Sequence, residues 1–230
     1  LEASDPFIQP DELIVGARLV MPEDEDQIDL GEYDPHYPPG HAMLLTKGLI
    51  GIRNEARQKL QTGIDPVSRD FLCAVDVSYG AACRYVERFA RHAECMALVE
   101  PDSARKVELE RISTICDELA SGIPTSFHSA LQLLQFVRVF GGRGCIGRFD
   151  QWMYPFYRRD IDQKRITQEE AQELLECLFV KLNHFPEANQ ADNDTLRNIS
   201  IAGQTSDGLD ASNDLTYMCI EASAKLMLPE

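Results

Sequence analysis

The sequence predicts a mainly α-helical fold with a few short strands. Apolar residues recur at helical spacing through most of residues 41–230, and residues that commonly cap helices stand where these runs begin. The clearest example is Thr167, which is followed three residues later by Glu170 and so forms the pattern of a capping box. Alternation of apolar and polar residues, which is typical of strands, is short and is best developed in residues 198–202.

Residues 1–40 differ from the rest of the chain, because they lack periodicity and are rich in Pro, Asp and Glu. Within them, residues 12–16 read as a short strand or a turn that enters a core, and residues 21–40 as an acidic loop. We interpret the acidic loop as a solvated surface. Carboxylates without a glycine-bearing loop of fixed spacing are weak evidence for the alternative, a metal site.

The periodic part of the chain predicts a series of helices. They are expected over about 41–62, 70–98, 103–122, 126–140 and 167–183, with a last helix that begins at Asp210 or Asn213. The side chains expected to face the core from the second helix are Phe71, Ala74, Val75, Ala82, Val86, Phe89, Ala93 and Met96. The fourth helix is apolar nearly all round and should be central. Pro155 lies in an aromatic block and predicts an irregular segment, because proline donates no backbone hydrogen bond.

The composition limits the classes of function. The chain has 230 residues, of which 44% are hydrophobic, enough for one large core or two small ones. Its formal net charge of -16 argues against nucleic acid as the main partner, because phosphate binding needs a basic surface. No stretch approaches the roughly 20 apolar residues of a membrane span, and there is no signal-peptide pattern. We expect a soluble, cytoplasmic protein whose ligand is a small molecule.

The cysteines are odd in number and scattered, and they form no CxxC pair. They are Cys73, Cys83, Cys95, Cys116, Cys145, Cys177 and Cys219. We expect free buried thiols in a reducing compartment, with no metal site among them.

Short motifs follow one another along nearly the whole chain. They are 11–16 (DELIVG), 40–41 (GH), 47–52 (KGLIGI), 126–132 (SFHSALQ), 147–151 (GRFDQ), 154–157 (YPFY), 171–175 (AQELL), 181–183 (KLN), 202–204 (AGQ) and 207–213 (DGLDASN). In this order they resemble the pyruvate formate-lyase (PFL) domain of glycyl radical enzymes, in the branch that contains glycerol and diol dehydratases. The resemblance implies a ten-stranded α/β barrel, made of two half-barrels and wrapped in helices.

The resemblance also implies which part of that domain this chain represents. Residues 1–230 would be an internal piece of the N-terminal half, with residues 1–40 as an irregular acidic segment and residues 41–230 as the helical part. The first residue, Leu1, and a last residue, Glu230, that directly follows a helical run agree with a piece of a longer protein.

The chemistry implied by the resemblance is radical-based. In the full-length enzymes, a separate radical-SAM activating enzyme installs a glycyl radical, and no other cofactor is expected on this chain. The radical passes to a cysteine, whose thiyl radical removes a substrate hydrogen atom so that a neighbouring C–C, C–O or C–N bond breaks. The motif of that cysteine, Gly-Cys-Val-Glu, belongs downstream of residue 230. We therefore expect no catalytic residue in this chain, and we interpret Cys145 as structural. A homodimer is also implied.

Two positions are carried over from the resemblance as substrate-binding candidates. His41 matches a histidine that contacts a substrate hydroxyl in the dehydratases; the alternative is a capping or solvent-facing loop histidine. Gly142 and Arg143 stand where the dehydratases have a His-Ser pair, so that Arg143 replaces a small hydroxyl side chain. Because a guanidinium favours a carboxylate, sulfonate or phosphate, an Arg143 that faces the cavity would indicate an anionic substrate.

Arg148 and Asp150 form a charged pair beside the aromatic block. Buried charges need partners, so we interpret the two residues as a structural, orienting salt bridge rather than as a catalytic dyad.

The sequence thus favours a segment of a glycyl radical lyase or dehydratase. The alternative is a truncated, non-catalytic PFL-like protein with a structural or assembly role. An unrelated helical binding protein is disfavoured by the ordered series of motifs.

Overall fold

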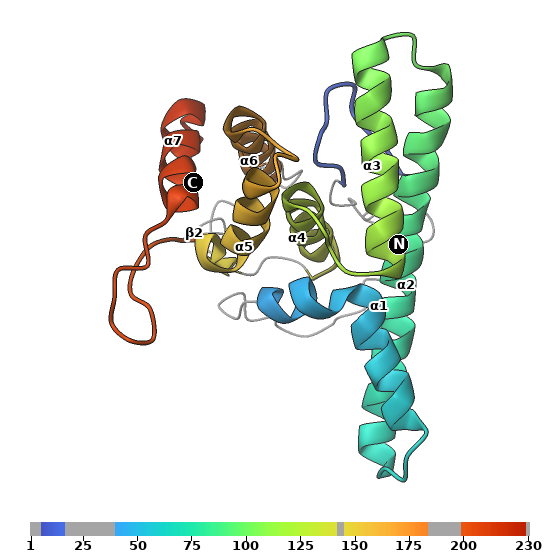
Figure 1. The fold of residues 1–230 in the computed structure, drawn as a ribbon. Coiled ribbons are helices and arrows are strands. Elements are labelled where there is room, and N and C mark those ends of the chain that lie inside the picture. Colours follow the sequence, from blue (N-terminus) through green and yellow to red (C-terminus); the bar gives the residue numbers. More distant parts are fainter. Residues whose placement is uncertain (1–5, 17–39, 142–144, 184–198, 229–230) are drawn as a thin grey trace. The chain divides into compact units, whose positions relative to one another are not determined.

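The structure, a computed structural model, describes residues 6–16, 40–141, 145–183 and 199–228. Its elements are α1 (His41–Leu60), α2 (Pro66–Val99), α3 (Ser103–Ser121), α4 (Phe127–Gly141), β1 (Gly147–Arg148), α5 (Phe149–Asp162), α6 (Gln168–Asn183), β2 (Ile199–Ser200) and α7 (Asp214–Leu226) (Figure 1). The mainly helical fold with few strands is therefore confirmed for the part described. No helix in these ranges has both the length and the apolar character that crossing a membrane requires.

The chain divides into two compact units, which are described separately. The first unit consists of Leu1–Val15 and Ala42–Leu133, and the second of Gly16–His41 and Leu134–Glu230. All of α1 except its first residue belongs to the first unit, and α4 contributes to both.

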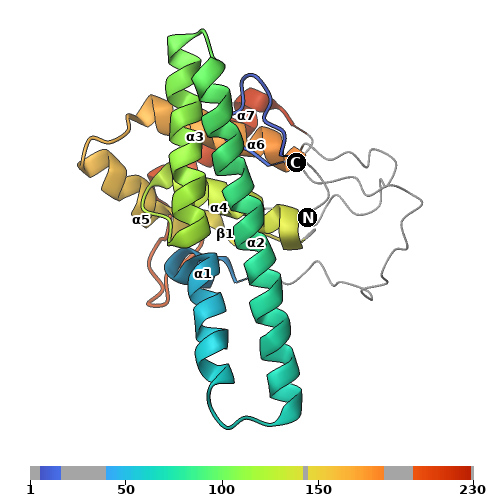
Figure 2. The same cartoon turned by 90° about the vertical axis from the view of Figure 1, so that its right-hand side faces the viewer.

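The centre of the first unit is the pair α2 and α3. Figures 1 and 2 both show α3 alongside the C-terminal half of α2. Every buried residue of α2 accordingly lies at or after Gly80. The expectation that Phe71 and Ala74 face the core is wrong, because both are exposed on the half of α2 that α3 does not cover.

Helix α2 also begins earlier than the sequence pattern predicts. The side chain of Asp65 accepts a hydrogen bond from the backbone N–H of Ser68, and Pro66 occupies the first turn. A carboxylate cap followed by proline is a strong helix start, because the proline ring presets φ and its missing N–H would have had no helical partner. Helix α3 ends at Gly122, as predicted.

Helix α1 is interrupted at Gly48, where φ is 65° and ψ is 174°. A Cβ added at this position would lie 2.1 Å from the carbonyl oxygen of Gly122. Only glycine accepts both this conformation and this close approach. Beyond the break, Arg53 and Arg57 each bind Asp76 of α2, at 2.7 and 2.8 Å.

Residues 6–15 are held in the first unit by side chains rather than by a strand partner. Arg105 of α3 donates to the carbonyls of Gln9 and Glu12, at 3.1 and 3.0 Å. Gln132 of α4 accepts from the N–H of Val15 and donates to its carbonyl, both at 2.8 Å. The two alternatives for residues 12–16 were a short strand and a turn that enters the core. The structure shows no strand there, and the residues enter the core as an irregular segment in which Val15 is completely buried.

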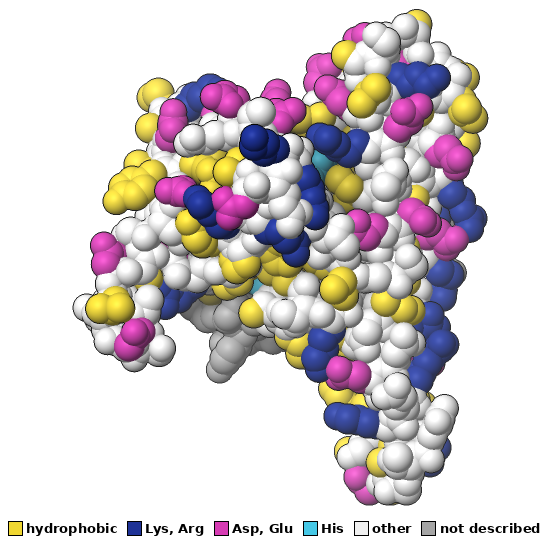
Figure 3. Space-filling view, in the orientation of Figure 1, with side chains coloured by type: hydrophobic (Ala, Val, Ile, Leu, Met, Phe, Trp, Pro, Cys, Tyr) yellow, Lys and Arg dark blue, Asp and Glu magenta, His cyan; other side chains and the backbone are white. Residues whose placement is uncertain are grey.

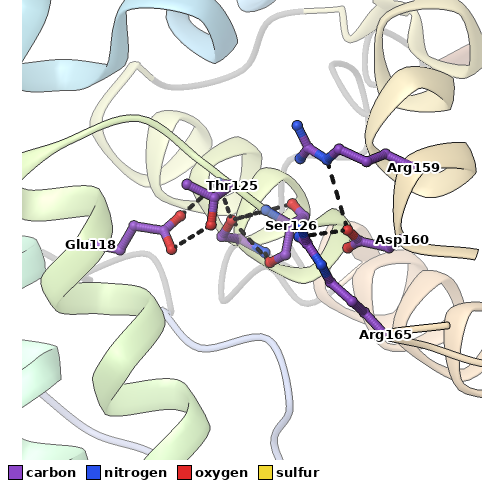
Figure 4. A network of polar contacts seen from close by, with 7 residues as sticks. Glu118, Thr125, Ser126, Arg159, Asp160 and Arg165 are labelled. Carbon is purple, nitrogen blue, oxygen red and sulfur yellow. Dashed lines mark hydrogen bonds and ion pairs between the residues drawn. The ribbon is translucent and has the colours of Figure 1, made fainter. Parts of the chain in front are cut away.

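The start of α4 is fixed by a polar cluster (Figure 4). The backbone N–H and hydroxyl of Thr125 donate to the carboxylate of Glu118, at 2.7 and 2.8 Å. The hydroxyl of Ser126 accepts from the N–H of Ser129 at 3.0 Å and so caps the helix. Residues 127–138 are all buried, which confirms that α4 is central.

In the second unit, β1 and β2 form a two-stranded parallel sheet, with Gly147 opposite Ile199 and Arg148 opposite Ser200. The helices α5 and α6 both pack against α7. The predicted capping box of α6 is confirmed, because the N–H of Thr167 donates to Glu170 at 2.8 Å and the N–H of Glu170 donates back to the Thr167 hydroxyl at 3.1 Å.

The prediction of an irregular segment at Pro155 is wrong, because Pro155 lies inside α5. The proline removes one backbone hydrogen bond, but tertiary packing on both sides of it offsets the loss. Phe149, Met153 and Tyr157 are all buried. Near the end of the helix, buried Asp160 pairs with Arg165 at 3.2 Å (Figure 4).

Candidate functional site

The candidate site of the second unit lies where β1 and β2 end. In parallel sheets, ligand sites form outside the carboxyl ends of the strands, where the following loops meet. Here β1 is followed by the rest of the GRFDQ motif and β2 by the AGQ motif. Residues 202–204 are called the AGQ turn below.

Arg148 and Asp150 both bind the backbone of the AGQ turn. The guanidinium of Arg148 donates to the carbonyls of Ala202 and Gln204, at 2.7 and 3.0 Å. The carboxylate of Asp150 accepts from the N–H of Ala202 at 2.7 Å. The salt bridge expected between Arg148 and Asp150 is absent from the described part of the chain, because each charge is used on the same peptide segment instead.

Asp150 has a second partner at the start of α7. Its Oδ2 atom accepts a 2.5 Å hydrogen bond from the hydroxyl of Thr216, while its side chain has no exposed surface. Oδ1 has no hydrogen-bond partner among the described residues. The nearby thiol of Cys219 has its pKa raised to about 12 by burial, with a further contribution from the charge of Asp150. Asp150 therefore connects the starts of α5 and α7 with the AGQ turn.

The AGQ turn has an unusual backbone. Ala202 has a φ of 58°, in the left-handed region where a Cβ is unfavourable, and Gly203 follows with a φ of 84°. Such conformations persist only where surrounding contacts determine them. The bonds from Arg148 and Asp150 to Ala202 are those contacts.

His41 is buried and stacks on Trp152. Their ring centroids are 5.0 Å apart with an interplanar angle of 23°, and Trp152 meets Phe149 edge-on at 5.8 Å. Only 5% of His41 is exposed, so the alternative of a solvent-facing histidine does not hold. Burial, together with the charge of Arg138, lowers the pKa of His41 to about 4. The imidazole is therefore neutral at pH 7, and its chemistry is hydrogen bonding rather than charge.

The sequence reading missed Arg138, whose charge acts on His41. It is the only Lys or Arg of α4, whose other side chains are mostly apolar with a few buried polar ones, and it is 6% exposed. The sequence did contain a signal for Arg138, because a charged residue on a helix with almost no polar face must be buried, and burying a cation is costly without a specific role.

Arg143 lies outside the described residues. The expectation that the thiols are buried is confirmed for Cys83, Cys116 and Cys219 and is wrong for Cys73 and Cys95, which are exposed. The remaining two, Cys145 and Cys177, are half-buried. Within the described ranges, no three His, Cys, Asp or Glu side chains come together as a metal site would require.

Comparison with known proteins assigns this geometry to a family. The model of the family described as pyruvate formate lyase-like (PFL-like) matches residues 32–230. The chain belongs to the PFL-like family.

The relatives of this PFL-like chain are much longer. The isethionate sulfite-lyase of Oleidesulfovibrio alaskensis is 35% identical over 207 residues, which cover 80% of this chain and 25% of the relative. The solved glycerol dehydratase of Clostridium butyricum is 34% identical with a TM-score of 0.76, over 85% of this chain and 27% of that one. A glycyl radical enzyme from Archaeoglobus fulgidus is 27% identical with a TM-score of 0.77, over 85% and 27%. The resemblance to glycyl radical enzymes is confirmed, and the chain spans about a quarter of these relatives.

In this PFL-like chain, motifs that are distant in sequence contact one another. The GRFDQ motif binds the AGQ motif through Arg148 and Asp150, and Gln151 donates to the carbonyl of Ala211 at 2.8 Å. Asn213 caps α7 and donates to the backbone carbonyl of Asp150 at 3.3 Å. The motifs at 147–151, 202–204 and 207–213 therefore form one structural cluster in the second unit.

Proposed function

We propose that this chain is a segment of a glycyl radical lyase or dehydratase that breaks a C–C, C–O or C–N bond of a small, anionic substrate. The single observation that carries the proposal is the family match over residues 32–230, supported by a relative named as a lyase and a solved relative named as a dehydratase. The catalytic cysteine and the radical glycine would lie in sequence outside residues 1–230, and the helices described here would wrap part of the ten-stranded barrel.

Within that assembly, His41 would contact the substrate. A buried, neutral imidazole can donate to or accept from a hydroxyl without competing for an ionic partner. Trp152 fixes its ring plane by stacking. Support for this role comes from the position of His41 at the start of α1 and from its burial in the second unit beside Arg138.

The anionic character of the substrate would be read by Arg143. A guanidinium can bind a carboxylate or sulfonate through two parallel hydrogen bonds. The relative from Oleidesulfovibrio alaskensis is named for isethionate, which carries a sulfonate. That name supports, for this chain, the choice of an anionic substrate over a neutral polyol.

Arg148 and Asp150 would act as positioning residues. They hold the AGQ turn at the carboxyl ends of β1 and β2, and they touch backbone rather than a space where substrate could lie. The active protein would be a cytoplasmic homodimer, activated by a radical-SAM enzyme, with the glycyl radical as its only cofactor.

Electron paramagnetic resonance tests the proposal. The product of the natural gene would be activated anaerobically with a radical-SAM activating enzyme, and a glycyl radical signal is expected. Incubation with isethionate should then release sulfite, whereas glycerol should remain unchanged. A signal with turnover of glycerol alone would remove the anionic substrate but keep the enzyme class.

A non-catalytic PFL-like protein with a structural or assembly role is the second candidate. The absence of any glycyl signal, under conditions in which a full-length relative is activated, would select this candidate over the enzyme.

A further inference from the structure

The side chains that hold residues 6–15 in the first unit bind the backbone of this segment. Arg105 of α3 and His128 and Gln132 of α4 are the side chains concerned. The backbone groups that they bind belong to Gln9, Glu12, Leu13 and Val15. We call the part of α3 and α4 that bears these three side chains the backbone-binding face. Because backbone groups are the same in every residue, these bonds hold an extended segment through its conformation.

The segment adds a small set of buried apolar side chains to these bonds. Ile8 is 3% exposed, Ile14 1% and Val15 0%, whereas Pro10 and Asp11 are exposed. Bonds to the backbone, combined with burial of a few side chains, are the usual way in which proteins bind extended peptides. Residues 6–15 thus lie on the backbone-binding face as a bound peptide would.

A cavity of about 360 Å³ lies beside the segment. Pro10 and Asp11 line it from the segment, Met96 from α2, and Arg105 and Glu108 from α3. Figure 3 shows Asp and Glu side chains at the surface over the end of α2 and the start of α3. At this point the segment leaves space that close packing would fill, so its place depends on the backbone bonds and on the buried side chains.

The segment has no continuous chain connection to α3 and α4 within its own unit. The first unit consists of Leu1–Val15 and Ala42–Leu133, and Gly16–His41 between them belongs to the second unit. The contacts between the segment and the backbone-binding face would therefore be the same if the segment came from another molecule. For this reason, exchange of an identical element between two copies is a low-cost route to a dimer.

We propose that the backbone-binding face accepts residues 6–15 of a second copy of this chain, so that two copies exchange the segment. Within one copy the tethered segment has an effective concentration in the millimolar range, and it competes with the second copy. The exchanged dimer is therefore expected at high protein concentration. The proposal goes beyond the proposed enzyme, because it requires neither a radical nor a substrate.

A free peptide tests the backbone-binding face in the full chain. Val15→Asp places a carboxylate at a completely buried position and should release the segment of the same molecule. A fluorescein-labelled peptide of residues 6–16 should then bind this variant in fluorescence anisotropy. Adding Gln132→Met should weaken the binding at least about tenfold, because both backbone groups of Val15 lose their partner. The same peptide carrying Val15→Asp is the matched control and should not bind.

Two results of this titration would overturn the proposal. One is equal binding of the peptide with and without Gln132→Met. The other is no binding to a Val15→Asp chain whose circular dichroism matches that of the unchanged chain.

The unchanged chain gives a second readout, which does not depend on the folding of Val15→Asp. Light scattering should show a dimer fraction that grows as the protein approaches millimolar concentration. An excess of the unlabelled peptide should dissociate this dimer, and the peptide carrying Val15→Asp should not. A chain that stays monomeric at millimolar concentration would contradict the exchange. A dimer that persists in excess peptide would also overturn it and would assign the dimer to another surface. Neither readout involves turnover, so a failure of the proposed enzyme chemistry leaves this test intact.

Discussion

In each unit, side chains hold a backbone segment through hydrogen bonds. Gln132, which holds Val15 in the first unit, is called the neutral clamp. Arg148 and Asp150, which hold Ala202 in the second unit, are called the charged clamp. In the first unit, Gln132 binds both the N–H and the carbonyl of Val15, as a neighbouring strand would. In the second unit, Asp150 can bind the N–H of Ala202 but not its carbonyl, because a carboxylate accepts hydrogen bonds and does not donate them. The carbonyl of Ala202 therefore needs Arg148 as a second residue. A single neutral amide thus binds both backbone groups of Val15, whereas two oppositely charged side chains are needed to bind both backbone groups of Ala202.

The difference corresponds to what each clamp holds. Val15 is completely buried and belongs to the irregular entry of residues 6–15, whereas Ala202 has a left-handed backbone. Neutral hydrogen bonds are enough to hold residues 6–15, because burial of Val15 already favours their position. A strained turn costs about 1–3 kcal/mol, and charge-assisted hydrogen bonds, roughly twice as strong as neutral ones, can offset that cost. The charged clamp thus lies beside the candidate site and the neutral clamp in a packing interface.

The largest expected effect is that of Asp150→Ala. The substitution leaves the donors of Ala202 and Thr216 without their buried carboxylate, and each such bond contributes about 1.5–3 kcal/mol. We expect the free energy of unfolding to fall by about 3–5 kcal/mol in urea denaturation. Asp162→Ala is the control on the same helix, because its pair with Arg158 is about half exposed and should contribute under about 1 kcal/mol. Equal losses for the two variants would contradict the charged clamp.

Gln132→Met should have the next largest effect. Methionine keeps the volume but leaves the N–H and carbonyl of Val15 buried without partners, for an expected loss of about 2–3 kcal/mol in the same measurement. Gln172→Met provides the comparison, because Gln172 is half-buried and makes longer bonds of 3.2 and 3.3 Å. A loss below about 1 kcal/mol for Gln132→Met would show that packing alone holds residues 6–15.

Lowering the pH should reduce the stability of the first unit, where the neutral clamp lies, through protonation of His128. This histidine donates to the carbonyl of Leu13 at 2.8 Å, and burial lowers its pKa from 6.5 to about 4, with Arg111 as the nearby charge. Below pH 6.5 the unfolded chain gains a proton that the folded chain does not accept until about pH 4, so stability falls as the pH falls through this window.

The size of this acid effect can be measured by substitution. At pH 5 the contribution of His128 should reach about 2 kcal/mol, because each pKa unit corresponds to about 1.4 kcal/mol. His128→Gln should therefore reduce the loss of stability between pH 7 and pH 5 by that amount. His41→Gln serves as the parallel variant in the second unit, since the pKa of His41 is also lowered to about 4. An unchanged pH slope in His128→Gln would exclude this residue as the source.

The smallest expected effect is a gain, from Ala202→Gly. Glycine removes the left-handed penalty of about 1–2 kcal/mol but loses about 0.5–1 kcal/mol through its freer unfolded state, so stability should rise by about 0.5 kcal/mol. Ala211→Gly, at a buried position without a positive φ, should be destabilising instead. A loss of stability in Ala202→Gly would mean that the turn is not strained.

Much of the helical architecture followed from local chemistry. The capping box at Thr167 and Glu170, the stop at Gly122 and the cap at Asn213 were all recognisable, because each depends on residues three or four positions apart. The central position of α4 followed from its lack of a polar face. The strand in residues 198–202 is confirmed as β2, at Ile199–Ser200.

The errors concern packing between elements. The exposure of Phe71 depends on where α3 stops covering α2, which periodicity within α2 does not encode. Pro155 remains helical because tertiary packing outweighs one lost hydrogen bond. In both cases a local preference was overridden by contacts with residues far along the chain.

For the candidate site, the sequence named residues but did not give their geometry. The motif order pointed to His41, Arg148 and Asp150, but the sequence did not show that the two charges share the peptide of Ala202. Nor did it show that His41 stacks on Trp152. Such pairings join residues more than fifty positions apart, and a single sequence has no signal for them.

The bond between Val15 and Gln132 also has a consequence for synthesis on the ribosome. Its partners are separated by 117 positions, so Ile14 and Val15 emerge long before α4 exists to receive them. At about 5–20 residues per second, the apolar entry segment waits for roughly 6–23 seconds. During that interval its apolar side chains stay exposed, and slower translation before Gln132 would prolong the exposure.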